Sequence, residues 1–81
     1  MLTSRHDRYR YLLPLTETEL ADDPASRERL IEKLQIACRT ERRRATAGFW
    51  AYHPTRHAAL VRALAIERQE LAAAIAETVP A

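Results

Sequence analysis

The chain has 81 residues, with 13 Lys or Arg and 11 Asp or Glu, so its formal net charge is +2 and its length fits a single domain. Its single glycine excludes glycine-rich phosphate-binding loops, and its single cysteine excludes an internal disulfide framework and paired-cysteine metal sites. The longest stretch without a charged side chain, residues 45–55, is too short to cross a bilayer as a helix.

The first fifteen residues contain no apolar run of the kind found in a signal peptide, because three arginines and an aspartate interrupt them. We therefore expect a cytoplasmic protein with no membrane span. Arginine outnumbers lysine 12 to 1, and 15 residues are alanine, which is typical of a GC-rich bacterial gene. The composition thus predicts a bacterial origin.

Residues 1–23 are predicted to form an N-terminal arm in which Tyr9 and Tyr11 lie among basic and leucine side chains. Such an arm either lies along a partner and orders on binding, or straps across the chain's own helices. Thr16 and Glu19 have the spacing of a capping box, which predicts a short helix near residues 17–22.

Asp23 and Pro24 predict the start of a long helix, because aspartate caps free backbone donors and proline suits the first helical position. The helix ends either near Gly48 or near Tyr52, and it cannot pass His53, which precedes a proline. Its charged face comprises Glu28, Glu32, Arg39 and Arg43. Its apolar stripe comprises Leu30, Ile31, Leu34, Ala37, Cys38 and Ala45.

A second helix is predicted from Thr55, or from Pro54 as its first residue, to about Thr78, because Pro80 prevents its continuation. Its abundant alanines favour helix formation. Together the two helices predict an all-α fold, an antiparallel two-helix hairpin over residues 24–81. The predicted apolar stripe of the second helix comprises His57, Leu60, Val61, Leu64, Leu71 and Ile75.

The supply of large apolar side chains is small for an independent domain. Leu, Ile, Val and Phe together number 17, and a domain of this size buries only about 60% of its unfolded surface. Ile36 and Ile66 also lie away from the two stripes. We therefore expect the hairpin to be completed by another protein, or by a second copy that closes a four-helix bundle.

These patterns predict a small protein-binding accessory subunit, adaptor or regulator. Aromatic and arginine side chains dominate the energetics of protein interfaces, and exposed apolar side chains away from the core favour contact with a partner. The predicted interaction residues are Tyr9, Tyr11, Ile36, Arg43, Trp50 and Ile66.

The alternative function is nucleic-acid binding through the densest basic run, formed by Arg39, Arg42, Arg43 and Arg44. On a helix these four side chains spread over about 200°, so they do not form one focused patch. Acidic residues are interleaved with them, and the net charge is low. Protein binding is therefore the favoured interpretation.

Metal binding and catalysis have little support. His53 and His57 have a spacing that suits a shared metal, but no acidic residue lies within nine positions of either, so we expect no metal and no cofactor. Glu41 lies on the apolar stripe of the first helix, and Glu67 and Arg68 flank the stripe of the second. We expect a pair such as Glu41 with Arg68 to bridge the helices; such a pair more often fixes register than acts as an acid or base. Cys38 is expected to pack as a small apolar group. Without a catalytic motif, we do not expect an enzyme.

Overall fold

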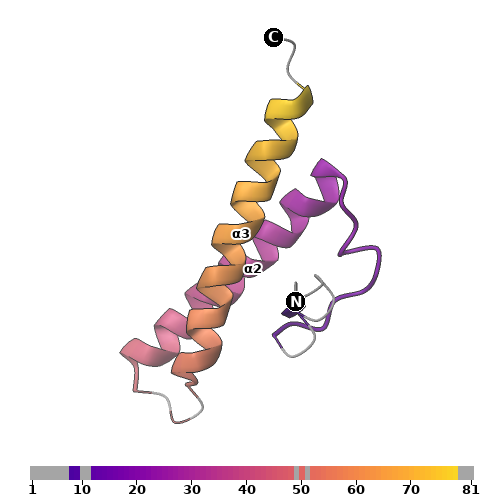
Figure 1. Cartoon of the computed structure of the whole chain (residues 1–81). Helices are drawn as coiled ribbons and strands as arrows, with labels where there is room; N and C mark the ends of the chain where they lie inside the picture. The colour runs from indigo at the N-terminus through magenta and orange to yellow at the C-terminus, as the bar shows by residue number, and fades with distance from the viewer. Residues whose placement is uncertain (1–7, 10–11, 49, 51, 79–81) are drawn as a thin grey trace.

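The computed structural model describes residues 8–9, 12–48, 50 and 52–78. Two long helices, α2 (Pro24–Thr46) and α3 (Pro54–Thr78), run antiparallel and pack against each other, and the described residues contain no strand (Figure 1). The molecule is elongated, with extents of 50 × 24 × 23 Å. The predicted all-α helical hairpin is confirmed.

The bounds of α2 follow from its two end residues. The Asp23 backbone is extended, and its carboxylate accepts a hydrogen bond from the Ser26 N–H at 3.0 Å. Hydrogen bonding to the Ser26 side chain and to its backbone lowers the pKa of Asp23. At the other end the helix stops at Thr46, and Gly48 adopts the left-handed conformation with φ of 65°. Of the two predicted ends, the structure has the one near Gly48.

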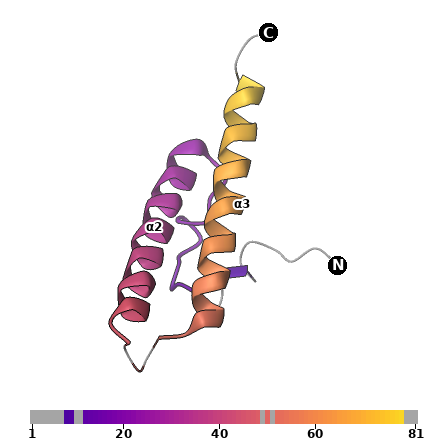
Figure 2. The ribbon, with the colours of Figure 1, turned by 90° about the vertical axis from the view of Figure 1, so that its left-hand side faces the viewer.

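The start of α3 also distinguishes between two predictions. Pro54 is the first helical residue, and the His53 carbonyl accepts the first helical hydrogen bond, from the His57 N–H at 2.9 Å. Proline is well suited to this position because it has no N–H to leave unsatisfied. The last turns of α3 extend past the beginning of α2 (Figure 2).

The predicted capping box forms, but the short helix after it does not. The Glu19 N–H donates to Thr16 Oγ1 at 3.2 Å, and the Thr16 N–H donates to Glu19 Oε1 at 3.1 Å. Only a turn follows, with the Leu20 N–H bonded to the Thr16 carbonyl at 3.2 Å. Asp23 must be extended to cap α2, so too few residues remain to propagate a helix.

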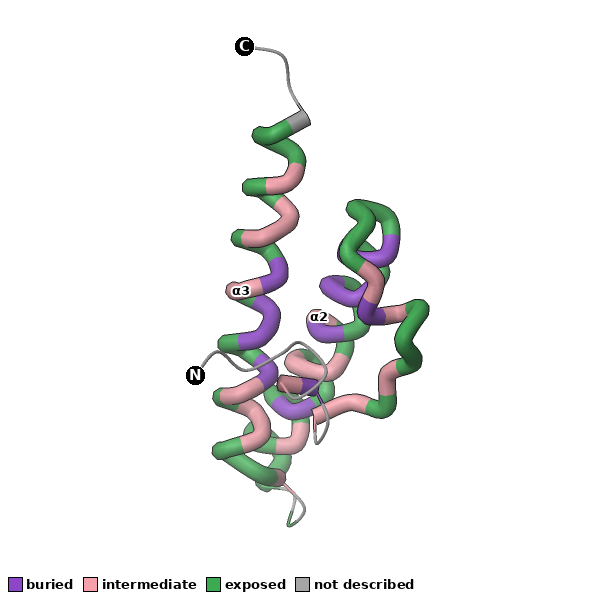
Figure 3. The backbone as a smooth tube through the Cα atoms, turned by 45° about the vertical axis from the view of Figure 1, so that its right-hand side comes forward, coloured by how far each residue is buried: buried purple, intermediate pink, exposed green. Residues whose placement is uncertain are grey.

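The core lies between the two helices and the segment that precedes them, and the buried parts of α2 and α3 face each other in Figure 3. The apolar stripe of α3 differs from the prediction, because Val61 and Ile75 are 50% and 47% exposed whereas Glu67 is fully buried. Ala45 of the predicted α2 stripe is also exposed. The buried apolar residues are Tyr9, Leu20, Leu30, Ile31, Leu34, Leu60, Ala63 and Leu64.

Candidate functional site

The N-terminal segment, here residues 8–9 and 12–23, covers one face of the hairpin. Leu12, Leu13 and Leu15 pack against the core, and the Leu12 carbonyl accepts a hydrogen bond from Arg56 Nη2 at 2.9 Å. In Figure 2 this segment lies behind both helices. Over its described residues it therefore straps across the chain's own helices, and the opposite side of the hairpin, which we call the open face, is left without it.

A buried carboxylate on α3 anchors the N-terminal segment. Glu67 Oε1 accepts a hydrogen bond from the Tyr9 hydroxyl at 2.8 Å, and Glu67 Oε2 accepts one from Arg27 Nη1 at 2.9 Å. The Arg27 guanidinium also contacts Glu70, and Arg8 Nη1 lies 3.8 Å from Glu67 Oε1. One carboxylate thus joins the N-terminal segment, α2 and α3.

This environment raises the pKa values of Tyr9 and Arg27. Burial and the neighbouring Glu67 carboxylate raise the pKa of the Tyr9 hydroxyl, which keeps the phenol protonated. Burial lowers the pKa of Arg27, but the Glu70 and Glu67 carboxylates outweigh burial and the net pKa is raised. The folded chain therefore holds a neutral phenol and a guanidinium cation against one carboxylate.

A second buried carboxylate lies near the turn between the helices. Glu41 Oε1 accepts hydrogen bonds from Arg44 Nη1 at 2.9 Å and from Arg56 Nη1 at 2.8 Å. The predicted pair of Glu41 with Arg68 does not form. Glu41 is near the end of α2 and so faces the start of an antiparallel α3, whereas Arg68 lies twelve residues, about 18 Å, beyond Arg56.

The predicted interaction residues occupy different environments. Tyr9 is buried in the chain's own core and makes an internal contact in place of the predicted partner contact, while Tyr11 lies outside the described residues. Trp50 is 90% exposed, and Arg43 is exposed. Ile66 is half-buried.

Ile36 is 53% exposed and borders a shallow apolar groove of about 290 Å³ between the N-terminal segment and α2. Leucine and proline side chains of the N-terminal segment line the other side of this groove. Its lining residues are Leu13, Pro14, Leu15, Lys33, Ile36 and Ala37.

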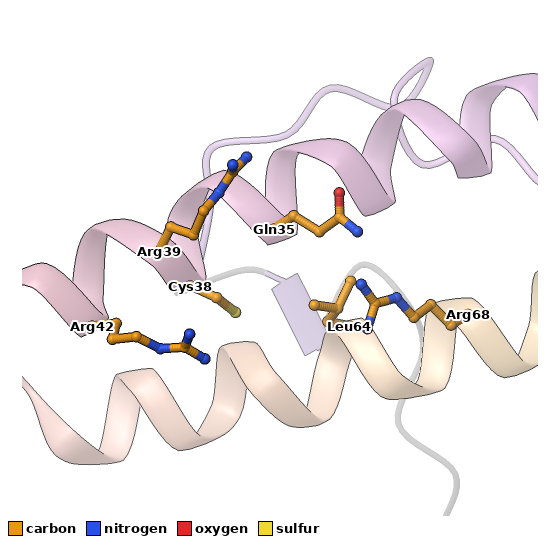
Figure 4. Close-up of a pocket in the computed structure, with 6 residues that line it drawn as sticks. All are labelled: Gln35, Cys38, Arg39, Arg42, Leu64 and Arg68. Carbon is orange, nitrogen blue, oxygen red and sulfur yellow. The ribbon is translucent and has the colours of Figure 1, made fainter.

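The four arginines of the predicted nucleic-acid cluster are not gathered in one place. Arg44 is held by Glu41, and Arg43 is exposed without lining a groove with the others. Arg39 and Arg42 instead join Arg68 of α3 around a groove of about 390 Å³ on the open face (Figure 4). We call it the arginine groove; its lining residues are Gln35, Cys38, Arg39, Arg42, Leu64 and Arg68.

Cys38 lies within the arginine groove between the two helices (Figure 4). Burial raises the pKa of its thiol, although Arg42 and Arg68 act in the opposite direction. The thiol therefore stays protonated at neutral pH, and Cys38 packs as a small, largely apolar group.

A third groove, of about 470 Å³, follows the exposed side of α3. Val61 lines it together with Ala58 and Ala65, which lie one helical turn to either side; we call these three residues the α3 flank. Because residues three and four apart are neighbours on a helix, the α3 flank adjoins Leu64 and Arg68 of the arginine groove. The remaining lining residues are Tyr52, Pro54, His57 and Arg62.

The histidines near the turn are not placed as metal ligands. His57 Nδ1 is 2.9 Å from the Tyr52 hydroxyl, and the two rings meet edge to face. Among the described residues there is no group of three or more His, Cys, Asp or Glu side chains that could hold a metal ion. None of the helices in the described ranges has the length and apolar character needed to cross a membrane.

Comparisons with known proteins give no relative for this chain: no family model, curated protein or solved structure matches it.

Proposed function

We propose that this chain is a protein-binding accessory subunit, adaptor or regulator that docks a partner on its open face. The observation that carries the proposal is the exposure of Val61, half of whose side chain faces solvent between two alanines in the groove along α3. The N-terminal segment covers the other face of the hairpin, so the open face is the side on which a second protein can approach both helices.

The shape and chemistry of the α3 flank suit a protein partner. An isolated exposed valine is ordinary on a protein surface, but here it lies in a groove with Ala58, Arg62 and Ala65. The small alanine side chains allow a partner's backbone to come close. Complete burial of a valine side chain contributes about 1.5 kcal/mol or more.

The composition of the chain's own core supports the same conclusion. Two of its buried positions are the carboxylates of Glu41 and Glu67, and a buried charge costs several kcal/mol of desolvation that its partners must offset. On α3, Glu67 takes a core position while Val61 stays half exposed, so apolar area on this helix remains for a partner to bury. Nucleic-acid binding is less well supported, because Arg44 is already paired and Arg43 lies outside the arginine groove.

The proposal is tested by adding one negative charge to the α3 flank. Immobilised wild-type chain and the variants Val61→Asp and Thr40→Asp are used to capture proteins from a lysate of the source organism. Thr40 is the control because it is exposed on α2 and lines none of the three grooves. We expect the wild type and Thr40→Asp to retain the same protein, and Val61→Asp to retain about tenfold less, a loss of about 1.4 kcal/mol.

Circular dichroism should show unchanged helix content for both variants, because both positions are exposed. Equal capture by Val61→Asp and the wild type, or no specific capture by either, would contradict the proposal. Light scattering on the same samples tests self-association. If the wild type is a dimer that Val61→Asp dissociates, the occupant of the open face is a second copy of this chain, and the proposed heterologous partner is wrong.

A further inference from the structure

The arginine groove brings positive charge from both helices to one place on the open face. Figure 4 shows the guanidinium groups of Arg42, from α2, and Arg68, from α3, extending over the space between the helices. Arg39 extends away from α3 at the outer edge, and the Gln35 amide adds a neutral hydrogen-bonding group on the α2 side. The groove therefore gathers hydrogen-bond donors from both α2 and α3 around one space.

The arginines of this groove differ from those that hold the core together. Arg27, Arg44 and Arg56 each pair with a buried carboxylate. In the part of the chain that the structure describes, no carboxylate lies within ion-pair distance of Arg39, Arg42 or Arg68. Like charges placed together repel one another, and a bound anion relieves that repulsion and forms charge-assisted hydrogen bonds.

The floor of the groove is apolar. Leu64 belongs to the buried core, and Cys38 is a half-buried, protonated thiol. Along α3 the floor continues into the α3 flank, where Val61 and Ala65 are exposed one helical turn away. The open face thus carries the apolar α3 flank and, beside it, the cationic side chains of the arginine groove between α2 and α3.

We propose that the arginine groove receives carboxylates from an acidic amphipathic helix of the partner, whose apolar side chains lie on the α3 flank. This inference rests on the proposed function and adds the chemistry of the partner. Glutamate or aspartate side chains on one edge of such a helix meet Arg42 and Arg68. Leucine-sized side chains on its adjacent edge cover Val61 and Ala65, which is the helix-in-groove mode of recognition.

The apolar character of the α3 flank favours a protein helix over a phosphate backbone as the ligand. A nucleic acid is held by cations that follow its backbone, with affinity that depends mainly on the number of phosphates neutralised. Here three arginines surround one groove, and the adjacent α3 flank consists of valine and alanine. An acidic amphipathic helix complements both parts of this surface, whereas a nucleic acid complements only the charged part.

The test uses the full chain and a fluorescent synthetic helix with leucines on one side and glutamates on the other. A matched peptide carries lysine at every glutamate position, and a single-stranded oligonucleotide serves as the phosphate probe. The groove variant is Arg42→Gln with Arg68→Gln. The control variant is Arg29→Gln with Arg43→Gln, which removes the same charge from two exposed arginines that do not line the arginine groove.

Fluorescence anisotropy should show that the acidic helix binds the wild type and the control variant, and that the groove variant binds it about tenfold more weakly. The lysine peptide should bind none of them. An equal loss in both double variants, or equal binding of the lysine peptide, would overturn the inference. Oligonucleotide binding that is lost only in the groove variant would also overturn it and assign the groove to nucleic acid.

The two proposals fail in different ways. If Val61→Asp prevents capture of the partner while the groove variant captures it and binds the acidic helix as the wild type does, the proposed function stands and the acidic-helix inference is wrong. If Val61→Asp leaves capture unchanged, the proposed function is wrong whatever the peptide measurements show.

Discussion

Replacing Glu67 with glutamine should lower the free energy of unfolding by about 3 kcal/mol or more. The Glu67 carboxylate is fully buried and receives hydrogen bonds from Tyr9 and Arg27, on two different segments. Glutamine has nearly the same shape but no charge, so Arg27 loses its buried counterion. A domain of this length has a total stability of only about 4–12 kcal/mol, so the loss is a large fraction of the whole.

Glu70→Gln is the matched control for Glu67→Gln. Glu70 also contacts Arg27, but its side chain is 40% exposed. Because exposed ion pairs contribute little, we expect Glu70→Gln to cost about 1 kcal/mol or less. Urea denaturation followed by circular dichroism measures both losses. Equal losses in the two variants would show that the buried position of Glu67 is not what matters, and would contradict the anchoring role assigned to it.

Replacing Tyr9 with phenylalanine should lower the free energy of unfolding by about 2 kcal/mol, because hydrogen bonds to charged groups contribute about 1.5–3 kcal/mol. The variant keeps the aromatic ring in the core but removes the hydroxyl that donates to Glu67 at 2.8 Å. The N-terminal segment should then bind the hairpin more weakly, and protease cleavage within this segment should become faster relative to the wild type.

Tyr9 also makes stability depend on alkaline pH. The pKa of Tyr9 is raised in the folded chain by burial and by Glu67, so the folded state holds this proton more tightly than the unfolded chain does. The contribution is complete below the unfolded tyrosine pKa of about 10 and is lost as the pH rises above it. Urea denaturation as a function of pH should show a steeper alkaline loss for the wild type than for Tyr9→Phe. Parallel pH profiles would contradict the buried hydrogen bond.

Local signals in the sequence predict the helix ends well. Asp23, Pro24 and Gly48 each act within a few residues of their own position, through a cap, a fixed backbone angle and a left-handed conformation. These effects need no knowledge of tertiary structure. The hairpin follows, because two helices joined by a short connection pack antiparallel.

The face that α3 turns toward the core cannot be predicted from its own pattern. Counting apolar residues places Val61 inside and treats Glu67 as a flanking charge, yet the structure buries Glu67 and exposes half of Val61. The cause lies forty residues away, because Arg27 supplies the counterion that allows Glu67 to be buried. Helical periodicity does not include such long-range pairs.

The arginine groove cannot be predicted from the sequence for a related reason. The basic run on α2 is visible in the sequence, but Arg68 joins it only through the register of the antiparallel helices. The same register places Glu41 far from Arg68 and within hydrogen-bond distance of Arg56. For the N-terminal segment, the sequence allowed either a strap or a partner-binding arm, and the contact of Tyr9 with Glu67 identifies the strap for its described part.

The most direct test of the docking role of the open face is site-specific photocrosslinking. A photoreactive aromatic amino acid is placed at Val61, at Ala65 or, as the control, at Thr40 on α2, and each full-length chain is irradiated in a lysate of the source organism. We expect positions 61 and 65 to crosslink to the same protein, through an acidic amphipathic segment, and position 40 not to crosslink to it. The absence of an adduct at positions 61 and 65, or equal adducts at all three positions, would contradict the docking role.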